Sequence, residues 1–393
     1  MDLRFTEAEE RFRQEVRDFL KAELPPEKQL GGGFEQDGLE ERWPVAREFE
    51  KKLAAKGWLT MAWPKEYGGQ GRSAVEQLIF TEEISYARAP GIGGMAVAFI
   101  GPTIAIYGNE EQKKEYLGRI ARGEIHFCQG FSEPNVGSDL ASLETRAVGD
   151  GDYYIINGEK IWTSAGHHAD YCWLGARTDF NAPRHKSISA FIVPMNTPGI
   201  TVLPIINIVG GHGFNQTVFE DVRIHKSYMV GEKNSGWYQL ATTLDFERSG
   251  VRLYALAKRN LEELVEYAKE TVRNGECLWD NGVIRNKLAA LAVEIEVGRM
   301  MAYRVAWMRD ASLVPSVEAS MCKLLASELS QRVVQVASEV LGMYFTLEEN
   351  SRWAPMAGRF TPAYFGAFAE TLASGTSEIQ RNVIAMRGLG LPR

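Results

Sequence analysis

Two short stretches of the sequence hold polar groups that could bind a ligand. The first, FSEPNVGSD at 131–139, has two hydroxyls and two carboxylates in a segment whose proline and glycine are typical of an irregular loop. Backbone N–H groups of such a loop can point at an anion or at the electron-rich edge of a ring. The second, GEKIWTSAG at 158–166, places an aromatic ring directly before two hydroxyls. Alone, the first indicates a structural loop and the second a sheet core, but together they indicate a ligand site.

Other motifs in the sequence do not support a nucleotide or hydrolase site. The stretch GIGGMA at 91–96 matches the dinucleotide pattern G-x-G-x-x-A, but it follows a helical pattern where that motif needs a strand. Neither a Walker glycine-lysine loop nor a G-x-S-x-G elbow occurs. The commonest nucleotide hydrolase and esterase classes are therefore excluded.

Composition excludes several kinds of partner. The chain has 393 residues, with 51 acidic and 44 basic side chains and a net charge of -7, and no basic run interleaved with aromatics, so we expect no nucleic acid partner. The charged start MDLRFTEAEERFRQEV does not resemble a secretion signal, and no apolar run of about 18 residues occurs, so we expect a cytoplasmic protein without a membrane span. The cysteines are far apart and predict neither a disulfide framework nor a metal site: Cys128, Cys172, Cys277 and Cys322.

Hydrophobic periodicity changes twice along the chain. The first third has a helical period, and it opens with a capping box formed by Thr6 and Glu9. From about Ile125 the period becomes two, and Asn157-Gly158 predicts a hairpin turn. The helical period then returns in four segments, which suit an antiparallel bundle: 238–272, 283–308, 316–341 and 376–388.

This order predicts an α+β chain of three domains. We expect a helical N-terminal domain at 1–125, an antiparallel β domain at 126–235 and a C-terminal four-helix bundle at 236–393.

The same features resemble those of the acyl-CoA dehydrogenase family over the whole chain. The resemblance rests on FSEPNVGSD, on GEKIWTSAG, on the helix-sheet-helix order and on the closing SGTSEIQRNVIA at 374–385. It implies FAD bound between the β domain and the bundle, with the β domain also binding CoA. The residues implied for the cofactor are Phe131 and Ser132 at the pyrimidine end, Trp162, Thr163 and Ser164 beside the ring and its N5, and Thr376 and Glu378 at the ribose and phosphate region. Ser138 is implied to contact the pantetheine or phosphate part of the substrate.

The family's reaction needs a carboxylate base, because the α proton of the thioester leaves while the β hydrogen is transferred as hydride. Many members carry this glutamate directly before the Gly-Thr of the last motif, where this chain has Ser374. Others carry it on the first bundle helix in sequences like Asp-Leu-Glu-Arg, and this chain reads Asp245-Phe246-Glu247-Arg248. On its own, a helical glutamate beside an arginine is typical of a solvated ion pair. The resemblance implies Glu247 as the base, with Asp245 and Arg248 near the CoA substrate and the Ser374 N–H donating to the thioester carbonyl.

The residues that a family subunit lends to its neighbour's flavin are eroded in this chain. The family uses an Arg-x-x-Phe-Gly turn, a nearby Gln, and a later Gln followed by paired glycines. Here Thr271 and Asn274 stand at the Arg and Phe positions, Gly282 stands near the Gln, and only Gly342 of the glycine pair is present. We interpret the chain as part of a tetramer, an α2β2 assembly in which a paralogous subunit lends these contacts. A homotetramer with altered contacts is the alternative.

The resemblance therefore implies FAD-dependent α,β-dehydrogenation of an acyl-CoA to the trans-2-enoyl-CoA, with electrons passed to an electron-transfer flavoprotein. Small residues at Gly91, Gly93, Gly94 and Ala96 suit a bulky steroid-side-chain-like, a branched or a dicarboxylic acyl group, or equally a tight loop. Two other functions stay open. One is an acyl-CoA or nitroalkane oxidase, and the other is an interaction subunit without chemistry of its own.

Overall fold

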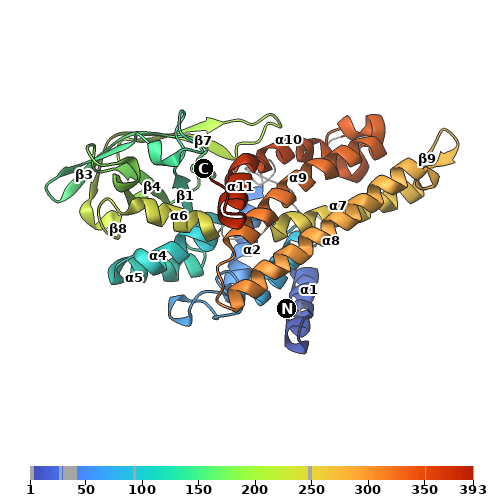
Figure 1. Cartoon of the computed structure of the whole chain (residues 1–393), viewed down its shortest axis with the longest axis horizontal. Helices are drawn as coiled ribbons and strands as arrows, with labels where there is room; N and C mark the ends of the chain where they lie inside the picture. Colours follow the sequence, from blue (N-terminus) through green and yellow to red (C-terminus); the bar gives the residue numbers. More distant parts are fainter. Residues whose placement is uncertain are drawn as a thin grey trace. The chain divides into compact units, whose positions relative to one another are not determined.

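The structure, a computed structural model, describes residues 4–25, 29, 42–91, 94–246, 250–349 and 351–392. The chain forms two compact units. The sheet unit comprises Gly38–Arg72 and Gly91–Glu247, and the helical unit comprises Met1–Asp37, Ser73–Pro90 and Arg248–Arg393. The order of helices, sheet and helices along the chain confirms the predicted α+β fold (Figure 1). The domain boundaries expected after residues 125 and 235 stay predictions.

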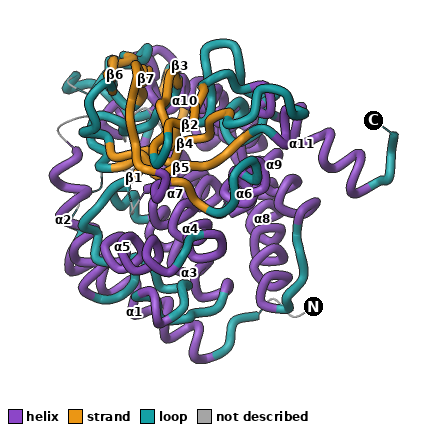
Figure 2. The backbone as a smooth tube through the Cα atoms, turned by 90° about the vertical axis from the view of Figure 1, so that its left-hand side faces the viewer, coloured by secondary structure: helices purple, strands orange, loops and turns teal. Residues whose placement is uncertain are grey.

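The sheet unit is built on an eight-stranded sheet in the order β6-β7-β3-β2-β4-β5-β8, with β1 paired to β4 (orange in Figure 2). Most neighbours are antiparallel, but β4 runs parallel to both β1 and β2. The strands are β1 Phe127–Gly130, β2 Arg146–Asp150, β3 Tyr153–Lys160, β4 Tyr171–Arg177, β5 Ile188–Pro194, β6 Ile200–Ile205, β7 Phe214–His225 and β8 Met229–Val230.

The helices of the sheet unit are α2 Trp43–Ala55, α4 Gly101–Tyr107, α5 Glu110–Ala121 and α6 Gly236–Phe246, with a short π-helix at Ala96–Ile100. Strands β4 and β5 are buried almost continuously, which is typical of strands covered on both faces. Gly175 of β4 allows the close approach of α6, because a Cβ at this position would lie 2.8 Å from Leu240 Cδ2.

The hairpin predicted at Asn157-Gly158 is wrong. Strand β3 runs straight through both residues, and the register against β7 shifts there, with Asn157 opposite two residues of β7, Glu220 and Asp221, so β7 carries a β-bulge. Gly158 has φ +146°, and a Cβ would lie 2.7 Å from Thr145 Cα. Asn157 accepts a hydrogen bond from Asp221 N across the bulge. The hairpin turn lies earlier, at Gly151-Asp152, where Asp150 of β2 pairs with Tyr153 of β3.

The helical unit contains α1 Glu7–Glu23, α3 Ala74–Tyr86, α7 Val251–Glu270, α8 Gly282–Asp310, α9 Ser316–Leu341, α10 Phe360–Glu370 and α11 Ser377–Val383, with a small hairpin of β9 Val272–Arg273 and β10 Glu276–Cys277. The predicted capping box of Thr6 and Glu9 is confirmed at the start of α1. Figure 1 shows α7 and α8 running alongside each other, and Gly298 of α8 lies against Tyr254 of α7, since a Cβ there would lie 2.0 Å from the Tyr254 ring.

Two of the expected bundle helices differ from the sequence pattern. The segment expected as one helix at 238–272 contains α6, which ends at Phe246 in the sheet unit, and α7, which begins at Val251 after Gly250 with φ +68°. Helix α10 was not expected, because its proline and glycine are poor helix formers. It nevertheless buries Phe360 and Ala367 in the core of the helical unit, so tertiary packing outweighs local propensity.

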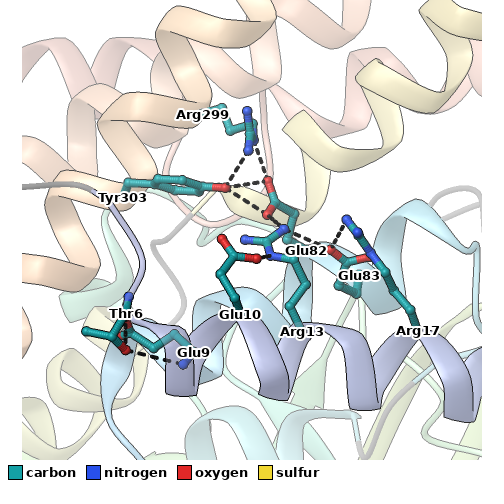
Figure 3. Close-up of polar contacts among 9 residues, drawn as sticks. All are labelled: Thr6, Glu9, Glu10, Arg13, Arg17, Glu82, Glu83, Arg299 and Tyr303. Atoms are coloured by element: carbon teal, nitrogen blue, oxygen red, sulfur yellow. Dashed lines mark hydrogen bonds and ion pairs between the residues drawn. The ribbon is translucent and has the colours of Figure 1, made fainter.

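A buried ion-pair network joins α1 to α3 and α8 in the helical unit (Figure 3). Arg13 Nη1 lies 2.8 Å from both Glu82 Oε2 and Glu83 Oε1, and Arg17 Nε lies 2.8 Å from Glu83 Oε2. From α8, Arg299 Nε and the Tyr303 hydroxyl both donate to Glu82. Burial by itself would raise the pKa of Glu82, but Arg299 and Arg13 hold it below its usual value.

Candidate active site

The first predicted ligand-binding stretch begins where β1 ends, in the sheet unit. Phe131 is buried, Ser132 is half-buried and Ser138 is exposed. The carbonyl of Ser132 accepts a hydrogen bond from Ile161 N at 2.9 Å, which ties this loop to the second stretch. The next turn is closed by Glu133 and Val136, each donating its N–H to the other's carbonyl at 2.9 Å. The two sequence stretches therefore lie side by side.

Lys160, the last residue of β3, binds the start of this loop through its side chain. Its ammonium is fully buried and donates to Phe131 O at 3.1 Å and to Glu133 Oε1 at 2.8 Å. Sequence reasoning did not single out this pair. The signal was available, because Lys160 continues the inward phase of Tyr154 and Ile156 along β3, a phase that a lysine seldom occupies without a partner.

Trp162 presents its indole to solvent on a strained backbone. The residue has φ +59°, a left-handed conformation that is rare for a large side chain, and it is 56% exposed. Its only aromatic neighbour in the described part of the chain is Phe214, edge to face at 6.0 Å. A flat apolar ring held in this way is available to flank a planar ligand.

The N–H, carbonyl and hydroxyl groups of Thr163 are all hydrogen-bonded inside the sheet unit. Its N–H donates to Asn215 O at 2.9 Å, its carbonyl accepts from Asn215 Nδ2 at 3.0 Å, and its hydroxyl accepts from Thr217 at 3.1 Å. Asn215 is itself fully buried and also contacts the rings of His167 and His212. Asn215 therefore fixes the backbone between Trp162 and Ser164, and Ser164 stays half-buried. The importance of Asn215 was missed because it lies about fifty residues away in sequence.

In the helical unit, Ser374 and Gly375 form a left-handed turn with φ +56° and φ +87°. Two side chains hold its carbonyls: Lys323 Nζ donates to Gly375 O at 2.8 Å, and Gln380 Nε2 donates to Ser374 O at 3.1 Å. Thr376 caps α11 by accepting from Ile379 N, and the exposed Glu378 has its pKa lowered by backbone and Thr376 hydrogen bonds.

Two buried polar atoms beside this turn lack a hydrogen-bond partner among the described residues. They are Ser377 Oγ and Gln380 Oε1. Both side chains are buried, so these atoms do not line an open surface.

The predicted base, Glu247, and its neighbour Arg248 lie outside the described residues, as does the side chain of Asp245. The remaining predicted residues are divided between the units. Phe131, Ser132, Ser138, Trp162, Thr163 and Ser164 lie in the sheet unit, and Ser374, Thr376 and Glu378 lie in the helical unit. Within the sheet unit, hydrogen bonds from Lys160 and Ile161 join the Phe131–Ser132 segment to the stretch that carries Trp162.

Over the ranges that the structure describes, no group of three or more His, Cys, Asp and Glu side chains could hold a metal ion. Within those same ranges, every helix is too short or too polar to cross a membrane.

Comparison with known proteins covers almost the whole chain. Three family descriptions match: "Acyl-CoA dehydrogenase, N-terminal domain" over residues 6–124, "middle domain" over 128–222 and "C-terminal domain" over 234–389. The chain is 37% identical over 401 residues to acyl-CoA dehydrogenase FadE26 of Mycobacterium tuberculosis, covering 100% of this chain and 99% of that protein.

Two similar solved structures are assemblies of two named chains. "Tcur3481-Tcur3483 steroid ACAD" is 36% identical with a TM-score of 0.91 and covers 100% of both chains. The ChsE4-ChsE5 complex from Mycobacterium tuberculosis is 36% identical with a TM-score of 0.90, again over 100% of both chains.

Proposed function

Because the chain belongs to the acyl-CoA dehydrogenase family, we propose that it oxidises an acyl-CoA thioester to the trans-2-enoyl-CoA with FAD as its cofactor. The observation that supports this most is Trp162, an exposed indole on a backbone that Asn215 fixes from both sides. Such a rigid, flat, apolar surface suits the isoalloxazine ring.

The residues present fit FAD. In the sheet unit, Phe131, Ser132, Trp162 and Ser164 would hold the isoalloxazine, and Thr163 would contribute by positioning its neighbours, since its own polar groups are already bonded. In the helical unit, Thr376 and Glu378 at the start of α11 would hold the ribose and phosphate region. When bound, FAD supplies the acceptor for the β hydrogen.

The chain's own residues carry out the proton chemistry in this proposal. Glu247 takes the α proton, and the Ser374 N–H donates to the thioester carbonyl, which favours charge on that oxygen as the proton leaves. Lys323 and Gln380 support this role because they donate hydrogen bonds to the two carbonyls of the Ser374-Gly375 turn and so fix its backbone. Asp245, Arg248 and Ser138 bind the CoA thioester.

The proposed substrate is a bulky acyl-CoA, and the proposed acceptor is an electron-transfer flavoprotein. The name of one similar structure includes "steroid ACAD", which supports a steroid-side-chain-like acyl group over other branched or dicarboxylic groups. Two-chain names such as ChsE4-ChsE5 support an α2β2 tetramer with a paralogous subunit.

The test is the replacement Glu247→Gln, followed by anaerobic mixing with acyl-CoA. We expect the bound flavin to stay oxidised, because the amide cannot accept the α proton, while flavin content and thermal midpoint stay those of the unchanged chain. The matched control is Glu266→Gln on α7, an exposed glutamate paired only with Lys269 in the described residues, which should leave reduction unchanged. Normal flavin reduction by the Glu247 variant would remove this residue from the mechanism.

Ser374 at the position of the commoner base favours one second candidate, an interaction subunit without chemistry. Substrate-dependent flavin reduction by the unchanged assembly, lost in the Glu247 variant, would exclude it. Turnover with oxygen as sole acceptor would instead favour an oxidase.

A further inference from the structure

We propose that the buried Lys160–Glu133 ion pair is a positioning device that aims the Phe131–Ser132 peptide at the flavin, so that FAD affinity depends on Lys160 although its side chain makes no ligand contact. This inference rests on the proposed function, because it assigns a role toward FAD.

The two charges are enclosed by the sheet unit. Lys160 is fully buried and Glu133 is 7% exposed, and their Nζ and Oε1 atoms are 2.8 Å apart. Enclosing an ion pair costs a large desolvation free energy, and well-packed apolar residues of similar size often serve stability as well or better. Stability alone therefore does not explain why these two positions carry charges.

Glu133 connects the loop to the segment before β2. Its Oε2 accepts from Glu144 N at 2.6 Å, and its Oε1 accepts from Thr145 N at 2.8 Å as well as from Lys160. Burial by itself would raise the pKa of Glu133, but Lys160 and the Thr145 hydrogen bonds hold it below its usual value. Burial lowers the pKa of Lys160 against the attraction of Glu133. The carboxylate thus fastens the loop to the backbone at Glu144 and Thr145 and to the side chain of Lys160 on β3.

Lys160 acts on the peptide that faces the proposed flavin. Its ammonium donates to Phe131 O at 3.1 Å. Because a trans peptide is planar, the direction of the Phe131 carbonyl also sets the direction of the Ser132 N–H, which points to the opposite side. The next carbonyl, of Ser132, is held by Ile161 N. A single strand end, residues 160–162, therefore holds two successive peptides of the loop and also carries the Trp162 ring.

Two variants distinguish a structural role of the Lys160–Glu133 pair from a positioning role. Lys160→Met leaves the Glu133 carboxylate buried without its cation, so it should lower both the thermal midpoint and the FAD affinity. The double variant Lys160→Met, Glu133→Gln leaves no unpaired charge, so its thermal midpoint should recover part of that loss. The recovery is incomplete because the glutamine offers one oxygen to the two N–H groups of Glu144 and Thr145. The Phe131 carbonyl of the double variant still has no donor, so FAD should remain bound about tenfold more weakly, the effect of losing one oriented hydrogen bond.

The experiment measures FAD dissociation by flavin fluorescence, the visible spectrum of the bound flavin and the thermal midpoint, with every variant in the same assembly as the unchanged chain. The control Lys226→Met removes an exposed lysine that is paired with Asp152 in the sheet unit, outside its strands, and should change none of these readouts. A double variant that regains stability and binds FAD as tightly as the unchanged chain would reduce the pair to a structural role. An unchanged assembly that takes up no FAD would instead overturn the proposed function together with this inference.

Discussion

His126 is a histidine whose surroundings oppose its protonation. It lies in the sheet unit between Trp43 and Arg47 of α2 and the strand β1, and its side chain is 13% exposed. Burial first, and then the positive charge of Arg47, lower its pKa to about 4, against the attraction of Asp170. Glu50 Oε2 lies 3.5 Å from its Nε2, but the Arg47 guanidinium contacts the same nitrogen. The folded protein therefore keeps this ring neutral.

This predicts a loss of stability in mild acid. The folded pKa of about 4 lies below the usual value of 6.5, so the unfolded chain binds the proton more readily. The unfolding free energy that depends on the neutral His126 ring is complete above pH 6.5 and is lost as the pH falls toward 4. We expect this loss to reach about 3 kcal/mol. Denaturant unfolding of the unchanged chain and of His126→Gln across this range checks it. Parallel pH profiles would show that the ring does not carry the effect.

At this scale the sequence drew attention to residues expected to face a ligand but not to the buried residues that hold them in place. Trp162 and the 131–139 loop stand out because their types and spacing are unusual within one short stretch. Lys160 and Asn215 do not, since their roles come from contacts with residues far away in sequence. The Glu247 role stays a prediction.

Among the elements, α1 depends on charges for its attachment to α3 and α8. Glu82 accepts from Arg13, Arg299 and Tyr303 in a buried setting (Figure 3). Removing one partner of a buried pair leaves the others uncompensated, so Glu82→Gln should cost about 3–5 kcal/mol of unfolding free energy. Chemical denaturation measures this. The exposed pair of Arg11 and Glu7 in α1 is the control, and Glu7→Gln should change the unfolding free energy by less than about 1 kcal/mol. Equal effects of the two variants would contradict a buried network.

Beside the bulge in β7, strand β3 has a glycine, Gly158, that we expect cannot be replaced. Gly158→Ala would place a Cβ 2.7 Å from Thr145 Cα at φ +146°, so the strand must shift. We expect a loss of roughly 1–3 kcal/mol. The control is Gly149→Ala in the neighbouring β2, where the nearest atom to a new Cβ is 3.9 Å away. Thermal unfolding of both variants compares them, and an equally mild effect at Gly158 would argue against the bulge geometry.

The elements also show where periodicity succeeds and fails. The long helices α8 and α9 and the alternation of β3 follow from strong local patterns. The same Asn-Gly dipeptide that predicts a hairpin serves a bulge here, because β7 lies beside β3 and continues the ladder past it. Helix α10 forms against its local propensity because its apolar face is buried.

At the scale of the whole molecule, the region that corresponds to the family's donor turn, eroded in this chain, folds back onto its own chain. Thr271 and Asn274 border the β9–β10 hairpin, whose turn has Asn274 at φ +55° and Gly275 at φ +86°. The arginine of this hairpin, Arg273, donates to Val340 O at 2.7 Å at the end of α9. Gly342 follows, close enough that a Cβ would lie 3.2 Å from the Arg273 guanidinium.

This supports the proposed α2β2 assembly, because an arginine that binds the end of its own α9 is not extended toward a neighbour's flavin. We expect the chain purified alone to hold little FAD and the chain co-expressed with a paralogous subunit to hold it fully, as measured by the visible spectrum and by the mass of the assembly. Arg273→Ala should weaken the hairpin's attachment without lowering flavin content, since the donor residues come from the paralogue. Full flavin occupancy in the lone chain would instead favour a homotetramer, and the eroded residues would then need no partner to explain them.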